Sequence, residues 1–181
     1  ILKQNPQIKH GNVAIAFTPD EEVGGGIEKF DIKGWGAKFA YTVDGEQLGD
    51  ISNETFSART ATVTFRGLST HPGTAKGIMI NSMYAAGDFL SRFPTEVPNR
   101  PETTAGRENY IHPYVGTLDI ETSVVKILLR DFDIAGFTAL EQKVKDLIAE
   151  TQKKYPKVKI DYSSELGYLN MKEVLKDYPQ L

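Results

Sequence analysis

The sequence has 181 residues, of which 40% are hydrophobic and 25% are charged, with a formal net charge of −3 and no cysteine. That composition is typical of a globular protein with one medium-sized domain or two small ones. Without cysteine there are no disulfides or thiolate ligands, so any bound metal must be held by carboxylate and imidazole groups.

The distribution of charge and hydrophobicity argues against two classes of partner. No block of lysine or arginine suits nucleic acid or an anionic membrane surface. No apolar run approaches the roughly 18 residues of a membrane-spanning helix. We therefore expect a cytoplasmic protein that binds neither nucleic acid nor membranes. The sequence begins at Ile1 with no signal-peptide pattern, and we expect the chain to be an internal segment of a longer protein.

The first predicted element is a short buried strand that is followed by three acids. The apolar run over residues 13–17 predicts a strand of the parallel-sheet kind, buried on both faces. Asp20, Glu21 and Glu22 would then lie at the carboxyl end of this strand, where open α/β sheets place their ligand crevice. One carboxylate can bind a cation there while its neighbour takes a proton from a metal-bound water. From the spacing alone, acids that stabilise the first turn of a helix are the more common explanation.

A second strand is predicted over residues 38–43, and it ends at Asp44 and Gly45. The two strands and their short connection would form a compact βαβ-like unit. Asp44 would then lie at the same sheet edge as Glu21 and Glu22. Asp-Gly is also a favoured turn sequence, so a plain turn is the alternative.

The pattern changes after residue 51 to alternating strands and amphipathic helices. Their order, β-α-β-β-α-β, is the split arrangement of a ferredoxin-like α+β sandwich. The predicted strands are 61–66, 110–120, 123–130 and 157–162, and the predicted helices are 79–93, 137–155 and the short 171–176. The expected buried stripes are Met79, Met83, Ala86, Leu90 and Phe93 on the first helix, and Phe137, Leu140, Val144, Leu147 and Ile148 on the second.

Four motifs follow one another along the chain. They are Phe17-Thr18-Pro19-Asp20-Glu21-Glu22-Val23-Gly24, Thr42-Val43-Asp44-Gly45, His71-Pro72-Gly73-Thr74-Ala75-Lys76-Gly77 and Arg130-Asp131-Phe132-Asp133. Together they resemble the peptidase T family of tripeptide aminopeptidases. This family belongs to the di-zinc exopeptidase superfamily that also contains carboxypeptidase G and succinyl-diaminopimelate desuccinylase.

The resemblance implies a role for each of five residues. Glu21 matches the family's general base, which takes a proton from the metal-bridging water and passes it to the leaving amine. Glu22 matches a ligand of one zinc ion, and Asp44 matches a ligand of the other. His71 matches an imidazole that is supplied across a dimer interface and stabilises an oxyanion. Arg130 ends an apolar strand, and its planar donor fork suits the carboxylate end of a short peptide substrate.

Simpler explanations stand beside two of these roles. His71 precedes a predicted helix, so it is also explained as a residue of the N-cap region. Arg130 is also explained as one partner of a surface salt bridge with Asp131 or Asp133.

The family pattern also implies a division of the chain. Residues 51–165 would form a lid or dimerisation domain, flanked by 1–50 as a partial α/β catalytic domain and by 166–181 as the start of the return into it. Each zinc ion normally takes at least three protein ligands, and this sequence lacks some that the pattern needs. We therefore expect the chain alone to be inactive and to bind zinc poorly, whereas the complete protein would hold two zinc ions per site.

The resemblance implies that the complete protein is a zinc-dependent aminopeptidase that releases the N-terminal residue of tripeptides and forms a homodimer through the lid domain. Two alternatives stay open. One is a related di-zinc carboxypeptidase or amidohydrolase. The other, for the segment alone, is a non-catalytic module that dimerises through a helix or a sheet edge.

Overall fold

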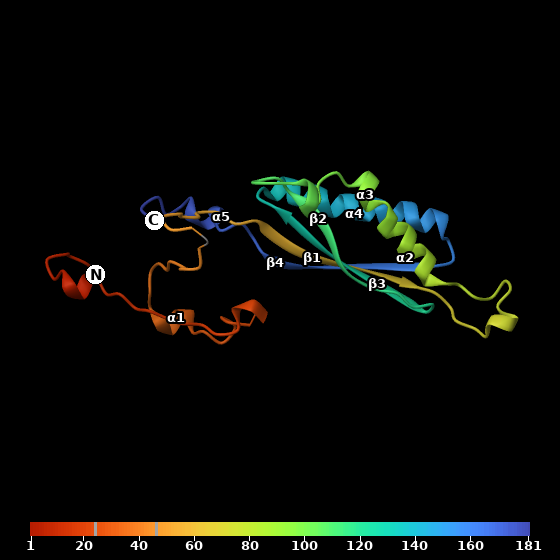
Figure 1. The fold of residues 1–181 in the computed structure, drawn as a ribbon, viewed down its shortest axis with the longest axis horizontal. Coiled ribbons are helices and arrows are strands. Elements are labelled where there is room, and N and C mark those ends of the chain that lie inside the picture. Colours follow the sequence, from red (N-terminus) through yellow and green to blue (C-terminus); the bar gives the residue numbers. More distant parts are fainter. Residues whose placement is uncertain (24, 46) are drawn as a thin grey trace. The chain divides into compact units, whose positions relative to one another are not determined.

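A computed structural model describes residues 1–23, 25–45 and 47–181, and it divides into two compact units, 1–50 and 51–181. The second unit contains a four-stranded sheet in the order β2-β3-β1-β4, in which all neighbouring strands are antiparallel. The two long helices lie on the same side of this sheet (Figure 1). The strands are β1 (Ser57–Arg66), β2 (Tyr110–Thr117), β3 (Thr122–Asp131) and β4 (Lys159–Tyr168), and the long helices are α2 (Ser82–Ser91) and α4 (Ile134–Lys154).

The element order confirms the predicted β-α-β-β-α-β arrangement of a ferredoxin-like sandwich. The remaining elements are short and lie in the connections. They are η1 (Leu2–Gln4), η2 (Glu21–Val23), α1 (Ile32–Trp35), η3 (Pro72–Thr74), α3 (Phe93–Glu96), η4 (Pro101–Thr103) and α5 (Lys172–Leu175). None of the helices in the described part of the chain is long and apolar enough to cross a membrane.

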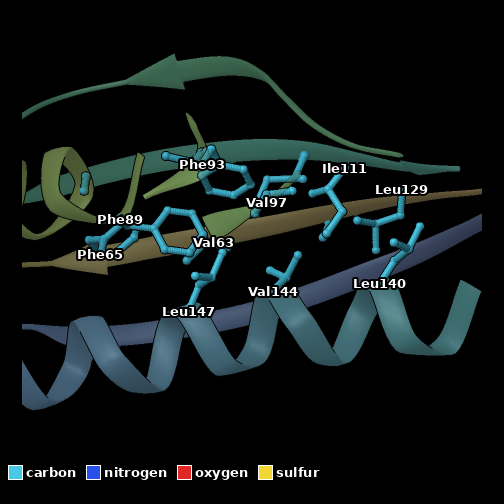
Figure 2. Close-up of a cluster of buried hydrophobic side chains, with 14 of the residues drawn as sticks. Val63, Phe65, Phe89, Phe93, Val97, Ile111, Leu129, Leu140, Val144 and Leu147 are labelled. Atoms are coloured by element: carbon cyan, nitrogen blue, oxygen red, sulfur yellow. The ribbon is translucent and has the colours of Figure 1, made fainter. Parts of the chain in front are cut away.

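The core lies between the sheet and the two long helices (Figure 2). Because side chains alternate along a strand, one face of β1 and β3 carries only apolar residues at its centre. These residues meet Phe89 of α2 and the stripe of α4 that was predicted from its spacing. The buried strand residues are Ala61, Val63, Phe65, Val125, Ile127 and Leu129, and the buried stripe residues of α4 are Phe137, Leu140, Val144 and Leu147.

The prediction for the first helix was only partly right. The helix begins three residues later than expected, because the Asn81 side chain accepts a hydrogen bond from the Met83 N–H (2.9 Å) and caps it. Ala85 and Phe89 are buried in place of Met79 and Met83. The helix is apolar around much of its circumference, so its spacing did not determine which stripe faces the sheet.

The strands predicted over residues 13–17 and 38–43 are wrong. The described part of residues 1–50 contains no strand, and the exposed side chains include Val13, Ile15, Phe17 and Val43. Phe17 is 93% exposed, although it was expected to be buried on a parallel sheet. A strand is stable only when a neighbouring strand pairs with its backbone groups. The described residues of this unit supply no such neighbour, so apolar sequence alone did not produce a strand.

A buried asparagine joins the segments that enter and leave the sheet. Asn170 is 3% exposed, and its Oδ1 accepts a hydrogen bond from the Thr55 N–H (3.0 Å). Its Nδ2 donates to the Phe132 carbonyl (3.0 Å), and its backbone N–H donates to Ser57 Oγ (3.1 Å). These bonds tie together three parts of the chain that are distant in sequence.

An ion-pair network joins the C-terminal end of α2 to α4. Arg92 contacts Asp88 (3.1 Å) and Glu150 (2.7 Å), and Lys154 also pairs with Asp88. Burial by itself would raise the pKa of Asp88, but hydrogen bonds from Lys154 and Arg92 outweigh it and hold the pKa below its ordinary value. Folding therefore favours the charged form of Asp88.

Candidate functional site

The acidic stretch forms a tight turn in the first unit. Glu21 and Glu22 are both exposed on η2. Asp20 has a positive φ of 62°, a left-handed conformation that Asp tolerates better than most residues, and its carbonyl accepts a hydrogen bond from the Gly25 N–H (3.1 Å). Asp44 is also exposed. Glu21, Glu22 and Asp44 therefore do not lie at the rim of a shared sheet, because that sheet is not formed.

The described residues do not fit a zinc centre. Within 1–23, 25–45 and 47–181, no three His, Cys, Asp or Glu side chains gather closely enough to hold a metal ion. Glu21, Glu22 and Asp44 are thus not brought together as one ligand group. A zinc ion normally takes at least three protein ligands, so these residues do not by themselves form the expected site.

His71 lies on an exposed arm, residues 68–80, which extends beyond the end of the sheet after β1 (Figure 1). Two backbone hydrogen bonds between Leu68 and Ile80 (2.7 and 2.9 Å) close the arm at its base. The arm contains Lys76 and His71 but no acid. Its charge therefore suits an anionic ligand better than a cation.

The local structure fixes the tautomer of the His71 ring. The Gly73 backbone N–H donates to Nδ1 of His71 at 3.1 Å. A backbone amide can only donate, so Nδ1 is the acceptor and, in the neutral ring, Nε2 carries the hydrogen. His71 also occupies the N-cap position of η3, as the simpler explanation required. The same contact leaves an exposed Nε2–H donor, which is the group that oxyanion stabilisation needs.

Arg130 is half-buried near the end of β3, between Tyr110 on β2 and Ala58 on β1. Its Nη1 donates to the carbonyls of Leu129 (3.0 Å) and Arg59 (3.4 Å). These are neutral acceptors, so they do not compensate the charge of the guanidinium.

The salt bridge that offered a simpler explanation of Arg130 is not formed. Across the described residues, no carboxylate lies within ion-pair distance of Arg130. Asp131, on the opposite face of the strand, instead accepts hydrogen bonds from Asn109 Nδ2 (2.6 Å) and the Asp133 N–H (2.8 Å). The guanidinium is thus available for a carboxylate ligand.

His71 and Arg130 lie at opposite ends of the same sheet. Ala58 pairs with Arg130, and β1 then runs eight residues to Arg66, before the arm begins. At about 3.3 Å per residue this is about 26 Å. An extended tripeptide spans only about 10 Å. One tripeptide therefore cannot contact both residues of the same chain.

The model of the peptidase dimerisation domain matches residues 53–159, which covers most of the sheet and both long helices. The chain belongs to the peptidase dimerisation domain family. The match includes the His71 arm and Arg130 and excludes the acidic turn. The family domain thus contains β1, β2, β3 and both long helices of the ferredoxin-like part.

Relatives extend the similarity beyond the peptidase dimerisation domain to the rest of the chain. The chain is 43% identical over 175 residues to peptidase T from Geobacillus sp. (strain WCH70), which covers 97% of the chain and 42% of that protein. It is 39% identical over 181 residues to peptidase T from Vibrio parahaemolyticus, which covers 100% of the chain and 44% of that protein. The chain thus spans less than half the length of these curated relatives.

Solved structures share the fold of the peptidase dimerisation domain. Aminopeptidase PepT from Bacillus cereus superposes with a TM-score of 0.68 at 19% identity, over 93% of this chain and 45% of that one. A hydantoinase/carbamoylase family amidase from Burkholderia ambifaria superposes with a TM-score of 0.52 at 15% identity, over 65% and 30% of the two chains. The fold is therefore common to proteins that are named for different reactions.

Proposed function

We propose that this chain is the central part of a zinc-dependent aminopeptidase that removes the N-terminal residue of tripeptides in the cytoplasm. The observation that carries the proposal is the 38–43% identity to peptidases T over 97–100% of the chain. Similarity across the acidic turn and the dimerisation domain together favours a peptidase over an isolated binding module.

In the longer protein, Glu21 would act as general base, and Glu22 and Asp44 would each bind one of two zinc ions. The described residues do not form this site alone, so the remaining ligands would come from outside the chain. Residues 1–50 and 166–181 would belong to a catalytic domain and residues 51–165 to the lid. Exposed apolar side chains in the first unit, such as Ile15 and Phe17, are consistent with further chain that covers them.

Arg130 would bind the carboxylate end of the tripeptide. Its uncompensated charge and its neutral neighbours on both adjacent strands support this role. An aminopeptidase that acts on peptides of fixed length needs a group that recognises the far end of the substrate. A cation that holds the terminal carboxylate provides this recognition.

A second copy of the chain would pair along β2. β2 contains no Asp, Glu, Lys or Arg, and its segment from Tyr114 to Thr117 is exposed. The opposite edge strand, β4, carries Lys159, Asp161 and Glu165, the kind of charges that protect an edge from pairing. A break in the β2 register between Pro113 and Val115 limits the exposed edge to its second half.

Pairing of two β2 strands about a two-fold axis would also bring His71 of one chain near Arg130 of the other. The two copies of β2 run antiparallel in such a pair, so the His71 end of one sheet lies beside the Arg130 end of the other. Because one tripeptide cannot contact both residues of a single chain, this arrangement would supply His71 from the partner subunit. His71 Nε2–H would then stabilise the oxyanion.

Activity of the longer protein with zinc tests the proposal. We expect hydrolysis of Ala-Ala-Ala and none of an N-acylated tripeptide, because an aminopeptidase needs the free amine. Glu21→Gln should retain zinc and abolish turnover, because an amide cannot take the proton from water. Glu22→Gln should weaken zinc binding, because a neutral amide is a poorer ligand than a carboxylate. Hydrolysis of the N-acylated peptide would support the carboxypeptidase or amidohydrolase alternative.

Mixed dimers test whether His71 acts across the interface. Glu21→Gln and His71→Ala subunits are each inactive in the proposed scheme. When they are mixed, hybrid dimers should recover one working site, because one intact base and one intact histidine then meet. If the mixture stays inactive while hybrids form, His71 acts within its own subunit.

A further inference from the structure

The base of the His71 arm packs against the turn between β2 and β3. The Gly67 N–H donates to the Glu121 carbonyl (2.8 Å), and the Ser82 N–H donates to the Ile120 carbonyl (3.0 Å). Gly67 precedes the arm and Ser82 follows it, so both ends of the arm are bonded to the same turn. The turn is therefore the common support of the arm.

A buried hydroxyl pair reinforces this support. Ser82 and Ser123 are fully buried, and their Oγ atoms lie 2.8 Å apart. Both hydroxyls are also within hydrogen-bond distance of the Asp119 carbonyl, at 2.6 and 3.0 Å. Buried hydroxyls that are satisfied by one another are costly to separate, so they fix the start of α2 against β3.

Backbone atoms closely surround Gly67 at the base of the His71 arm. A Cβ at this position would overlap the carbonyl oxygens of Ile80 and Ile120 and would lie 2.9 Å from the Ser82 nitrogen. All three atoms are backbone atoms that take part in the bonds of the arm base. They cannot move aside without breaking those bonds, so only glycine lets the segments approach this closely.

We propose that Gly67 is a positioning residue for His71, an inference that rests on the proposed function of His71. The arm is exposed and short of regular structure, so its direction is set by its two ends, of which one follows β1 and the other precedes α2. Gly67 allows both ends to bond to one turn. The position of the imidazole relative to the rest of the site then depends on the absence of a side chain at residue 67.

Hydrogen exchange on the 181-residue chain directly tests whether Gly67 anchors the base of the His71 arm. In Gly67→Ala, we expect the amides of Leu68 and Ile80 to exchange at least about tenfold faster, because their reciprocal bonds open. The amide of Val144 in α4 should keep its protection. Gly87→Ala is the matched control, because a Cβ there meets nothing within 4 Å and the base amides should be unaffected.

A second, less disruptive substitution keeps the test valid if Gly67→Ala does not fold. Ser82→Ala removes the hydroxyl bonds to Asp119 and Ser123 without adding atoms, and the base amides should exchange several-fold faster. If the amides of Leu68 and Ile80 exchange as in the unmodified chain in whichever variant folds, Gly67 and its neighbours do not anchor the arm.

Kinetics of the longer protein separate positioning from general stability. Gly67→Ala should lower kcat about 10- to 100-fold with KM and zinc content unchanged, because His71 acts on the transition state and not on substrate binding. Faster exchange at the base with an unchanged kcat overturns the positioning role. If the unmodified longer protein has no peptidase activity, the proposed function fails, and the exchange result still decides whether Gly67 anchors the arm.

Discussion

Two phenylalanines of opposite exposure offer the sharpest test of the fold. Phe89 is fully buried, with its ring centre 5.5 Å from that of Phe65 and 5.3 Å from that of Phe93. Truncating a buried phenylalanine to alanine costs about 3–5 kcal/mol, and the loss of two ring contacts places Phe89→Ala in the upper half of this range. That is about a quarter or more of a typical free energy of unfolding. Phe17 is 93% exposed, so Phe17→Ala should change stability by less than about 0.5 kcal/mol.

Urea unfolding measures both changes on the same chain. Far-UV circular dichroism follows α4, the longest helix, and the fluorescence of Trp35, the only tryptophan, follows the first unit. Phe89→Ala should shift the dichroism midpoint strongly, and Phe17→Ala should shift neither signal. A loss of 2 kcal/mol or more on Phe17→Ala would mean that Phe17 is buried, as the sequence predicted, and would contradict its exposure in the structure.

Three further predictions concern the ion-pair network, the sheet edge and the buried asparagine. Asp88→Asn should cost about 1–2 kcal/mol at neutral pH. Because folding lowers the pKa of Asp88, the ionised side chain contributes to the free energy of unfolding above about pH 4, and this contribution is lost as pH falls through the folded pKa. The urea midpoint of Asp88→Asn should therefore fall less on acidification than that of the unmodified chain. Val115→Lys should weaken self-association at least about tenfold in sedimentation equilibrium, whereas Ser163→Lys on β4 should not; equal effects would argue against β2 as the paired edge. Asn170→Ala should cost about 2–4 kcal/mol in urea unfolding, since it removes the hydrogen-bond partner of the part-buried Thr55 N–H and Phe132 carbonyl, and a cost below about 0.5 kcal/mol would contradict that account.

Local sequence patterns were sufficient for most of the second unit. The alternation in β1 and the spacing of Phe137, Leu140, Val144 and Leu147 each reflect one face of one element, and the structure buries those faces. Such a pattern succeeds because the residue types repeat with the period of the element itself. The first helix was less well predicted, because apolar residues lie on several of its sides and only the Asn81 cap marked its start.

Other features had no local signal. Gly67 has no distinguishing neighbour in the sequence, yet it lies where residues 80 and 120 converge on it. Asn170 likewise bonds to groups that are 38 to 115 positions away. A sequence pattern over a few residues holds no information about such approaches, because they are set by how distant segments pack.

The sequence by itself determined the order of the strands and long helices in residues 51–181 and which residues carry the motifs of the family. The tertiary structure decided what those residues can reach: it placed His71 and Arg130 at opposite ends of one sheet and left Phe17 exposed without a neighbouring strand. The physical reason is that periodicity fixes the face of an element, whereas burial and convergence depend on partners that are remote along the chain.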